Sequence, residues 1–146
     1  MSKTILIVED DPDVRNGLHI RLKANGYTTV MAADAPGTIS QARKCAPDLI
    51  VLDLGLPGGD GFLVMERLKS NPTLAVIPVI IVSARDVHAN HERALKAGAK
   101  AFLQKPVENA ELLRVIRQTL GESDAPTELQ TRDAAGRRRE GDSVLI

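Results

Sequence analysis

The chain has 146 residues, which is enough for one compact domain and too few for two domains of ordinary size. Hydrophobic residues make up 43% of it and aromatic residues only 2%, so its core is expected to be aliphatic. The 19 basic and 19 acidic side chains cancel, which excludes a global positive field that would recruit nucleic acid or a membrane. A single cysteine excludes an internal disulfide, and the N-terminal apolar run is too short for a signal peptide or a membrane span. These features favour a cytoplasmic protein.

Short strand-like runs alternate with helical patterns along the chain. Three runs of four residues are apolar at every position, which is typical of strands buried on both faces of a parallel sheet. Helical periodicity, aspartate caps and terminal glycines define the segments between them. In chain order, the sequence predicts a strand at 5–8, a helix from 12 that ends at 26, a strand at 28–32, a helix over 35–45, a strand at 49–52, a helix over 62–70, a strand at 79–82, a helix over 87–97, a strand at 101–104 and a helix over 108–120.

The first predicted helix shows the pattern most clearly. Asp11 can cap it and Pro12 can occupy its first position. Val14, Leu18 and Leu22 then recur every four residues, so we expect them to face the core.

Five repeats of strand followed by helix predict an α/β fold with a doubly wound parallel sheet and right-handed crossovers. Such sheets bind ligands at the carboxyl ends of their strands. Residues 1–121 are predicted to form this domain. Residues 122–146 lose the apolar periodicity and are predicted to form a disordered or flexible tail.

Polar side chains follow four of the predicted strands. Glu9, Asp10 and Asp11 follow the first, Asp53 the third, Ser83 the fourth, and Lys105 the fifth. Taken singly, Asp10 or Asp11 can be a helix cap, Lys105 a solvated charge and Ser83 a turn residue. Their joint placement at one sheet edge favours a site instead.

Carboxylates gathered in this way repel one another, by roughly 4 kcal/mol per pair at ~4 Å and an effective dielectric constant of ~20. Oxygen ligands without nearby His or Cys favour a hard cation, Mg²⁺ or Mn²⁺. Such an ion suits phosphoryl transfer, in which an aspartate can be the nucleophile and form an acyl phosphate.

The stretches ILIVEDDPDVR, LIVLDLGLPGGDGF, PVIIVSARD and GAKAFLQKPV resemble the receiver domain of response regulators in two-component signalling. The resemblance covers about residues 3–121 and is closest to stand-alone, chemotaxis-regulator-like receivers. It implies a flavodoxin-like fold with five helices and a five-stranded parallel sheet in the order 2-1-3-4-5.

The resemblance also implies roles for the residues of the site. Asp53 would be the phosphoacceptor, and Asp10 and Asp11 the acidic pair that binds Mg²⁺ together with Asp53 and the backbone carbonyl of Gly55. Glu9 is expected to lie outside the ligand set. Lys105 would pair with the phosphoryl group and precede a cis bond to Pro106.

A switch is implied as well. Ser83 would move to donate a hydrogen bond to the phosphoryl group, and Phe102 would swing inward behind it. This would reshape the surface formed by the fourth helix, the fifth strand and the fifth helix. The alternative interpretation of Phe102 is an ordinary core residue.

The predicted function is therefore a phosphoacceptor that receives a phosphoryl group on Asp53 from a histidine kinase or phosphotransfer protein. The protein would act on an unidentified downstream protein, as a monomer or a phosphorylation-linked dimer, without binding DNA or a membrane. It would catalyse only its own phosphorylation and dephosphorylation, and so would not be an enzyme that turns over a metabolite. One alternative is a scaffold that works without phosphorylation. Another is an aspartyl-nucleophile phosphatase, which Gly55 argues against because such enzymes resembling the dehalogenase family carry a second Asp there.

Overall fold

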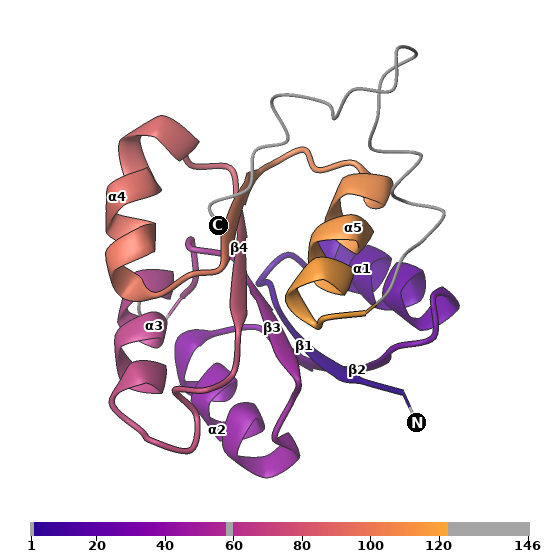
Figure 1. Cartoon of the computed structure of the whole chain (residues 1–146), viewed down its shortest axis with the longest axis horizontal. Coiled ribbons are helices and arrows are strands. Elements are labelled where there is room, and N and C mark those ends of the chain that lie inside the picture. Colours follow the sequence, from indigo (N-terminus) through magenta and orange to yellow (C-terminus); the bar gives the residue numbers. More distant parts are fainter. Residues whose placement is uncertain (1, 58–59, 123–146) are drawn as a thin grey trace.

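A computed structural model describes residues 2–57 and 60–122 of the chain. Within these ranges, strands and helices alternate throughout, as the sequence predicts (Figure 1). Predicted and observed ends agree within about two residues for most elements. The elements are β1 (Thr4–Val8), α1 (Pro12–Ala24), β2 (Thr28–Ala32), α2 (Ala35–Cys45), β3 (Leu49–Leu52), α3 (Gly61–Lys69), β4 (Val79–Ser83), α4 (Val87–Ala97), β5 (Ala101–Gln104) and α5 (Asn109–Thr119).

The described strands form one parallel sheet in the order β2-β1-β3-β4-β5, which confirms the predicted doubly wound topology. Helices α1 and α5 cover one face, and α2, α3 and α4 cover the other (Figure 1). Alternate strand residues therefore enter two separate cores, so Ile5 and Ile7 pack with α1 and α5 whereas Leu6 and Val8 pack on the opposite face. This arrangement explains why the central strands are apolar at every position.

Aspartates cap four of the helices at the connections that follow strands. The side chains of Asp11, Asp34, Asp60 and Asp86 accept hydrogen bonds from backbone N–H groups in the first turns of α1, α2, α3 and α4. Each cap satisfies donors that have no partner inside the helix. The chain therefore turns sharply from each of these strand ends or connecting loops into the next helix.

The three apolar residues that recur along α1 differ in burial. Leu18 and Leu22 are buried as expected, but Val14 is 38% exposed. Val14 lies in the first turn of α1. The N-terminus of this helix extends beyond the core, so the Val14 side chain is partly exposed.

Gly61 brings the loop after β3 close to the backbone of α3. A Cβ atom at this position would lie 2.7 Å from Leu54 Cα and 2.9 Å from the carbonyl oxygen of Asp53. Contacts this short with backbone atoms exclude any larger residue unless the loop moves. The missing side chain of Gly61 thus helps to fix the backbone around Asp53.

The last described residue, Glu122, is hydrogen-bonded to the domain. Its backbone N–H donates to the carbonyl of Arg117, and its Oε1 accepts from the Tyr27 hydroxyl at 2.6 Å. Glu122 is the only part of the predicted tail within the described residues, and 123–146 lie outside them. Among the described helices, none is long and apolar enough to cross a membrane.

The Tyr27–Glu122 contact makes a spectroscopic prediction. Burial, followed by the hydrogen bond to Glu122, raises the pKa of Tyr27 to about 12. The associated stability is therefore present below the ordinary tyrosine pKa of about 10 and is lost as pH rises through about 12. Because the chain has one tyrosine and no tryptophan, phenolate absorbance reports this group alone. Glu122→Gln should shift the folded-state titration toward lower pH, with the urea-unfolded chain as the reference, and coincident titrations of wild type and variant would contradict this prediction.

Candidate functional site

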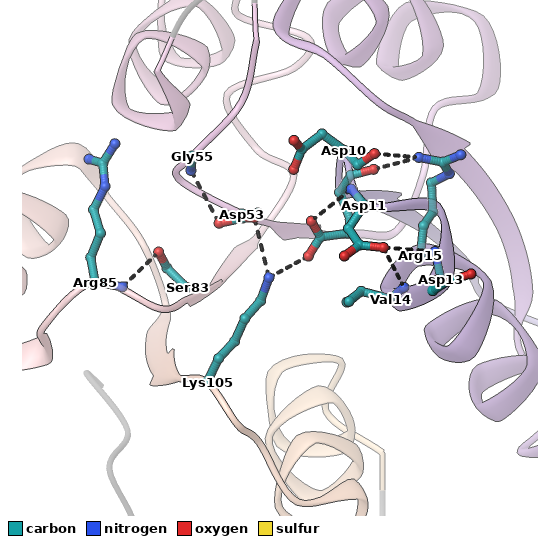
Figure 2. Close-up of polar contacts among 11 residues, drawn as sticks. Asp10, Asp11, Asp13, Val14, Arg15, Asp53, Gly55, Ser83, Arg85 and Lys105 are labelled. Atoms are coloured by element: carbon teal, nitrogen blue, oxygen red, sulfur yellow. Dashed lines mark hydrogen bonds and ion pairs between the residues drawn. The ribbon is translucent and has the colours of Figure 1, made fainter.

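The polar residues that follow β1, β3 and β5 meet at the carboxyl edge of the sheet, as predicted. Figure 2 shows Asp53 and Lys105 pointing toward each other, with Asp10 and Asp11 on the side of α1. One carboxylate oxygen from each of Glu9, Asp10 and Asp53 lies within 4.8 Å of the other two. These residues directly follow β1 and β3, which are neighbours in the sheet, so their convergence depends directly on the β1–β3 pairing.

Backbone hydrogen bonds continue the sheet pairing past the strand ends and hold the site residues in place. The backbone N–H of Glu9 donates to the carbonyl of Ala32 at 3.1 Å, and that of Asp53 donates to Val8 at 3.0 Å. The backbone N–H of Lys105 donates to Ser83 at 2.8 Å. The peptide bond between Lys105 and Pro106 is cis, as predicted.

Lys105 provides the positive charge of the cluster. Its Nζ donates a hydrogen bond to Glu9 Oε1 and another, at 3.3 Å, to Asp53 Oδ2. Asp53 Oδ1 accepts a third hydrogen bond from the backbone N–H of Gly55 at 3.1 Å (Figure 2). Both oxygens of Asp53 are thus oriented, and its side chain is 12% exposed, so it is close to solvent without being freely hydrated.

Burial perturbs the titration of this pair. It raises the pKa of Glu9, whose side chain is 4% exposed, and the hydrogen bond from Lys105 opposes that rise. Burial also lowers the pKa of Lys105, but its hydrogen bonds and attraction to Glu9 and Asp53 outweigh this effect, so the net pKa is raised. Lys105 is therefore kept as an ammonium between the two carboxylates.

Asp11 does not join the carboxylate group, although the sequence assigned it to the metal-binding pair. Its Oδ1 accepts hydrogen bonds from the backbone N–H groups of Asp13 at 2.9 Å and Val14 at 3.3 Å, so it caps α1 (Figure 2). Glu9, which was expected outside the ligand set, occupies the position beside Asp10 and Asp53. Oδ1 of Asp11 is therefore engaged at the N-terminus of α1, and its carboxylate is not part of the group formed by Glu9, Asp10 and Asp53.

Arg15 is a positioning residue that no sequence pattern indicates. Its guanidinium donates to the backbone carbonyls of Glu9 at 2.8 Å and Asp10 at 3.3 Å. These contacts fix the backbone of the turn that carries Glu9 and Asp10. The only signal in the sequence is its place one turn into α1, from which it can reach back over the cap.

Ser83 is the last residue of β4, and Phe102 lies in the neighbouring strand β5. Ser83 is 1% exposed, and its Oγ accepts a hydrogen bond from the backbone N–H of Arg85 at 3.2 Å. Phe102 is fully buried in the core on the α3 and α4 side of the sheet. Its ring already occupies the inward position that the switch interpretation assigns to the phosphorylated protein, and this burial equally suits an ordinary core residue.

The acidic group suits a hard divalent cation. Its donors are carboxylate oxygens from three residues, and no His or Cys belongs to the described group. Lys105 balances part of the negative charge, but three carboxylates and one ammonium still leave a local excess of negative charge. Glu9, Asp10 and Asp53 are therefore the residues that would hold Mg²⁺.

Comparison with known proteins identifies the class of protein that this fold and edge site define. The profile of the response regulator receiver domain matches residues 5–117. The chain is also 37% identical to the response regulator PleD of Caulobacter vibrioides over 139 residues, which is 94% of this chain and 30% of PleD. The chain therefore belongs to the receiver domain family of two-component response regulators. It spans about half or less of the length of the curated relatives that it matches.

Solved structures agree with this assignment. A response regulator from Chloroflexus aurantiacus superimposes with a TM-score of 0.78 at 32% identity, covering 84% of this chain and 100% of the other. The receiver domain of the sensor histidine kinase PA1611 from Pseudomonas aeruginosa superimposes with a TM-score of 0.76 at 28% identity, with the same coverages. That protein has a magnesium ion coordinated in its active-site cleft.

Removing the ammonium should make stability depend more strongly on pH. A carboxyl group with a raised pKa binds its proton more tightly in the folded state, so the free energy of unfolding falls as pH rises from the ordinary Glu9 value of 4.5 through the raised value. Lys105→Met removes the cation that limits this effect. The variant should be close to wild type near pH ~4.5 and about 1–3 kcal/mol less stable near pH ~7.5.

Urea denaturation followed by circular dichroism, with a chelator present, would measure this difference. Lys100→Met is a suitable control because Lys100 is exposed and precedes the same strand. A stability difference between Lys105→Met and wild type that is the same at both pH values would contradict the assigned role of the ammonium.

Proposed function

We propose that Asp53 accepts a phosphoryl group from a phosphohistidine on a histidine kinase or phosphotransfer protein, with Mg²⁺ bound by the adjacent carboxylates. The observation that carries this proposal is the setting of Asp53. Its two oxygens are oriented by Gly55 and Lys105, beside the carboxylates of Glu9 and Asp10. Membership of the receiver family supports the same assignment.

The chemistry follows from this geometry. A carboxylate oxygen of Asp53 would form a bond to phosphorus while the phosphorus–nitrogen bond of the donor breaks, and the leaving imidazole nitrogen would take up a proton. Lys105 Nζ, which is 3.3 Å from Asp53 Oδ2, would pair with an oxygen of the transferred group. Positioning and charge neutralisation of this kind account for most of the catalysis in phosphoryl transfer.

Mg²⁺ fits the residues that are present. Glu9, Asp10 and Asp53 would hold the ion, and the magnesium in the PA1611 receiver supports this assignment. When bound, Mg²⁺ would neutralise negative charge on the phosphoryl oxygens. We further predict that the backbone carbonyl of Gly55 is a ligand of the ion. We also predict that Mn²⁺ can replace Mg²⁺.

The output would be a change in protein binding. We infer that the chain turns over no external substrate, because the site holds its own phosphoacceptor and Gly55 stands where phosphatases with an aspartyl nucleophile would carry a second Asp. The downstream partner would recognise the surface of α4, β5 and α5. Ser83 ends β4 directly before the segment that leads into α4, so a change at the site can reach that surface through a few residues.

Substitution of the phosphoacceptor tests this function. Asp53→Asn should abolish acid-stable, base-labile incorporation of phosphate from a small acyl phosphate or a phosphorylated histidine kinase, because the amide is not a nucleophile. Phosphoprotein gel electrophoresis and intact-mass measurement would follow the reaction. Asp48→Asn, which removes an exposed carboxylate at the opposite end of β3, is the matched control and should label like wild type. Undiminished labelling of Asp53→Asn would exclude the proposal.

The choice between Glu9 and Asp11 as a metal ligand can be tested by a matched pair of variants. Glu9→Gln should weaken Mg²⁺ binding roughly tenfold or more, equivalent to about 1.4 kcal/mol, because it removes a carboxylate from the group. Asp11→Asn should leave the affinity almost unchanged, since asparagine caps a helix about as well as aspartate. Isothermal titration calorimetry measures both. The reverse order of effects would return Asp11 to the ligand set.

A further inference from the structure

An ion pair connects the segment after Ser83 to the start of α3. Arg85 lies between Ser83, which ends β4, and Asp86, which caps α4. Its backbone N–H donates to Ser83 Oγ at 3.2 Å, and its guanidinium Nη1 lies 3.2 Å from Asp60 Oδ2. One residue therefore contacts both the hydroxyl of the site and a separate helix.

Asp60 is a firm attachment point for this contact. Its other carboxylate oxygen, Oδ1, accepts a hydrogen bond from the backbone N–H of Phe62 at 2.6 Å and so caps α3. Its backbone carbonyl accepts from Leu63 at 2.9 Å. Because both contacts belong to the first turn of α3, the orientation of the Asp60 side chain is tied to that helix, and the position of Arg85 is tied to it as well.

Helix α4 exposes most of the side chains that the structure describes. Among the α4 residues whose burial the structure describes, only Ala94 is fully buried. A groove of about 470 Å³ is lined by residues of both α3 and α4. The guanidinium of Arg93 crosses it to lie 4.0 Å from the centre of the Phe62 ring. A helix packed this lightly can respond to the loss of a single contact.

The Ser83 hydroxyl is held in a particular direction. Figure 2 shows its oxygen turned toward Arg85, on the side away from Lys105. To donate a hydrogen bond to a phosphoryl group on Asp53, the hydroxyl and its surrounding backbone must adjust toward Asp53. The contact with the Arg85 N–H opposes this adjustment as long as Asp60 holds Arg85.

We propose that the Arg85–Asp60 ion pair is a latch that keeps the β4–α4 segment and the Ser83 hydroxyl in the resting orientation. Arg85 and Asp60 are thus positioning residues for the reaction at Asp53, and the inference rests on the function proposed above. Breaking the latch favours the orientation in which Ser83 reaches the modified Asp53. Both side chains are 39% exposed, so solvent screens the pair and the expected effect is modest, roughly two- to fivefold.

Two variants, each of which removes one of the two opposite charges, test the latch. Arg85→Ala removes the cation, whereas Asp60→Asn removes the anion and keeps a carbonyl oxygen that can cap α3. Each should increase the rate of Asp53 phosphorylation by acetyl phosphate roughly two- to fivefold, and each should lower the beryllofluoride concentration needed for half-saturation by a similar factor. The double variant should gain no more than either single variant, because the two substitutions break the same contact.

The direction of the two effects separates the latch from simple electrostatics. If only the net charge near the site mattered, Arg85→Ala would slow the reaction with an anionic donor and Asp60→Asn would accelerate it, and that pattern would overturn the proposal. Equal rates for wild type and both variants, with stability altered or not, would overturn it too.

A control and a reference complete the experiment. Glu92→Gln removes the exposed ion pair with Lys96 on α4 without touching the Ser83 segment, and should leave both measurements at wild-type values. Wild type and Asp53→Asn are measured in parallel. Absence of wild-type labelling would refute the proposed function itself, whereas normal wild-type labelling with unchanged latch variants would refute the latch alone.

Discussion

The site depends on one electrostatic constraint: carboxylates at the edge of a parallel sheet must share a single ammonium group. Glu9 and Asp53 directly follow neighbouring strands, and their side chains are 4% and 12% exposed. Two acids so poorly hydrated repel each other strongly. Lys105 donates a hydrogen bond to both and offsets part of this repulsion, and this arrangement is also ready for a divalent cation or a phosphoryl group.

The fold meets this constraint with little freedom of side-chain or backbone position. Sheet hydrogen bonds extend beyond β1 and β3 to Glu9 and Asp53, and the backbone of Lys105 pairs with Ser83. The backbone of each site residue is therefore fixed by the same pairing that buries the two aliphatic cores. Precise placement of this kind is what phosphoryl transfer requires, because the protein contributes mainly position and charge.

The sequence was sufficient to predict the sheet and the convergence of Asp53, Lys105 and the acidic turn, because strands that are apolar at every position have few alternatives to a covered parallel sheet. Within the acidic turn, the structure groups Glu9 with Asp10 and Asp53, whereas the sequence pattern favours Asp10 and Asp11. The chain continues in strand pairing for one residue past Val8, through the hydrogen bond from Glu9 to Ala32, and so Glu9 rather than Asp11 is directed into the group. Pro12 in the first position of α1 is typical of a helix capped by the preceding residue, which agrees with the capping role of Asp11.

The contact between Arg85 and Asp60 shows what sequence patterns omit. The two residues are 25 positions apart, and neither lies in a strand or inside a helix. Their meeting depends on how two loops at the sheet edge are placed after the core has formed, and no periodicity encodes that placement.

The site consists of two parts that are held in place by different contacts. Glu9, Asp53 and Lys105 are fixed by sheet hydrogen bonds, whereas the Ser83 hydroxyl is fixed through a loop and a half-exposed ion pair. A free-energy change of about 1 kcal/mol is small compared with the free energy that stabilises the sheet. It is comparable to the whole contribution of an exposed ion pair to stability. Addition of a phosphoryl group would therefore leave the first part in place and move the second. Because the loop leads directly into the lightly packed α4, the physical path from chemistry to surface change begins at Ser83.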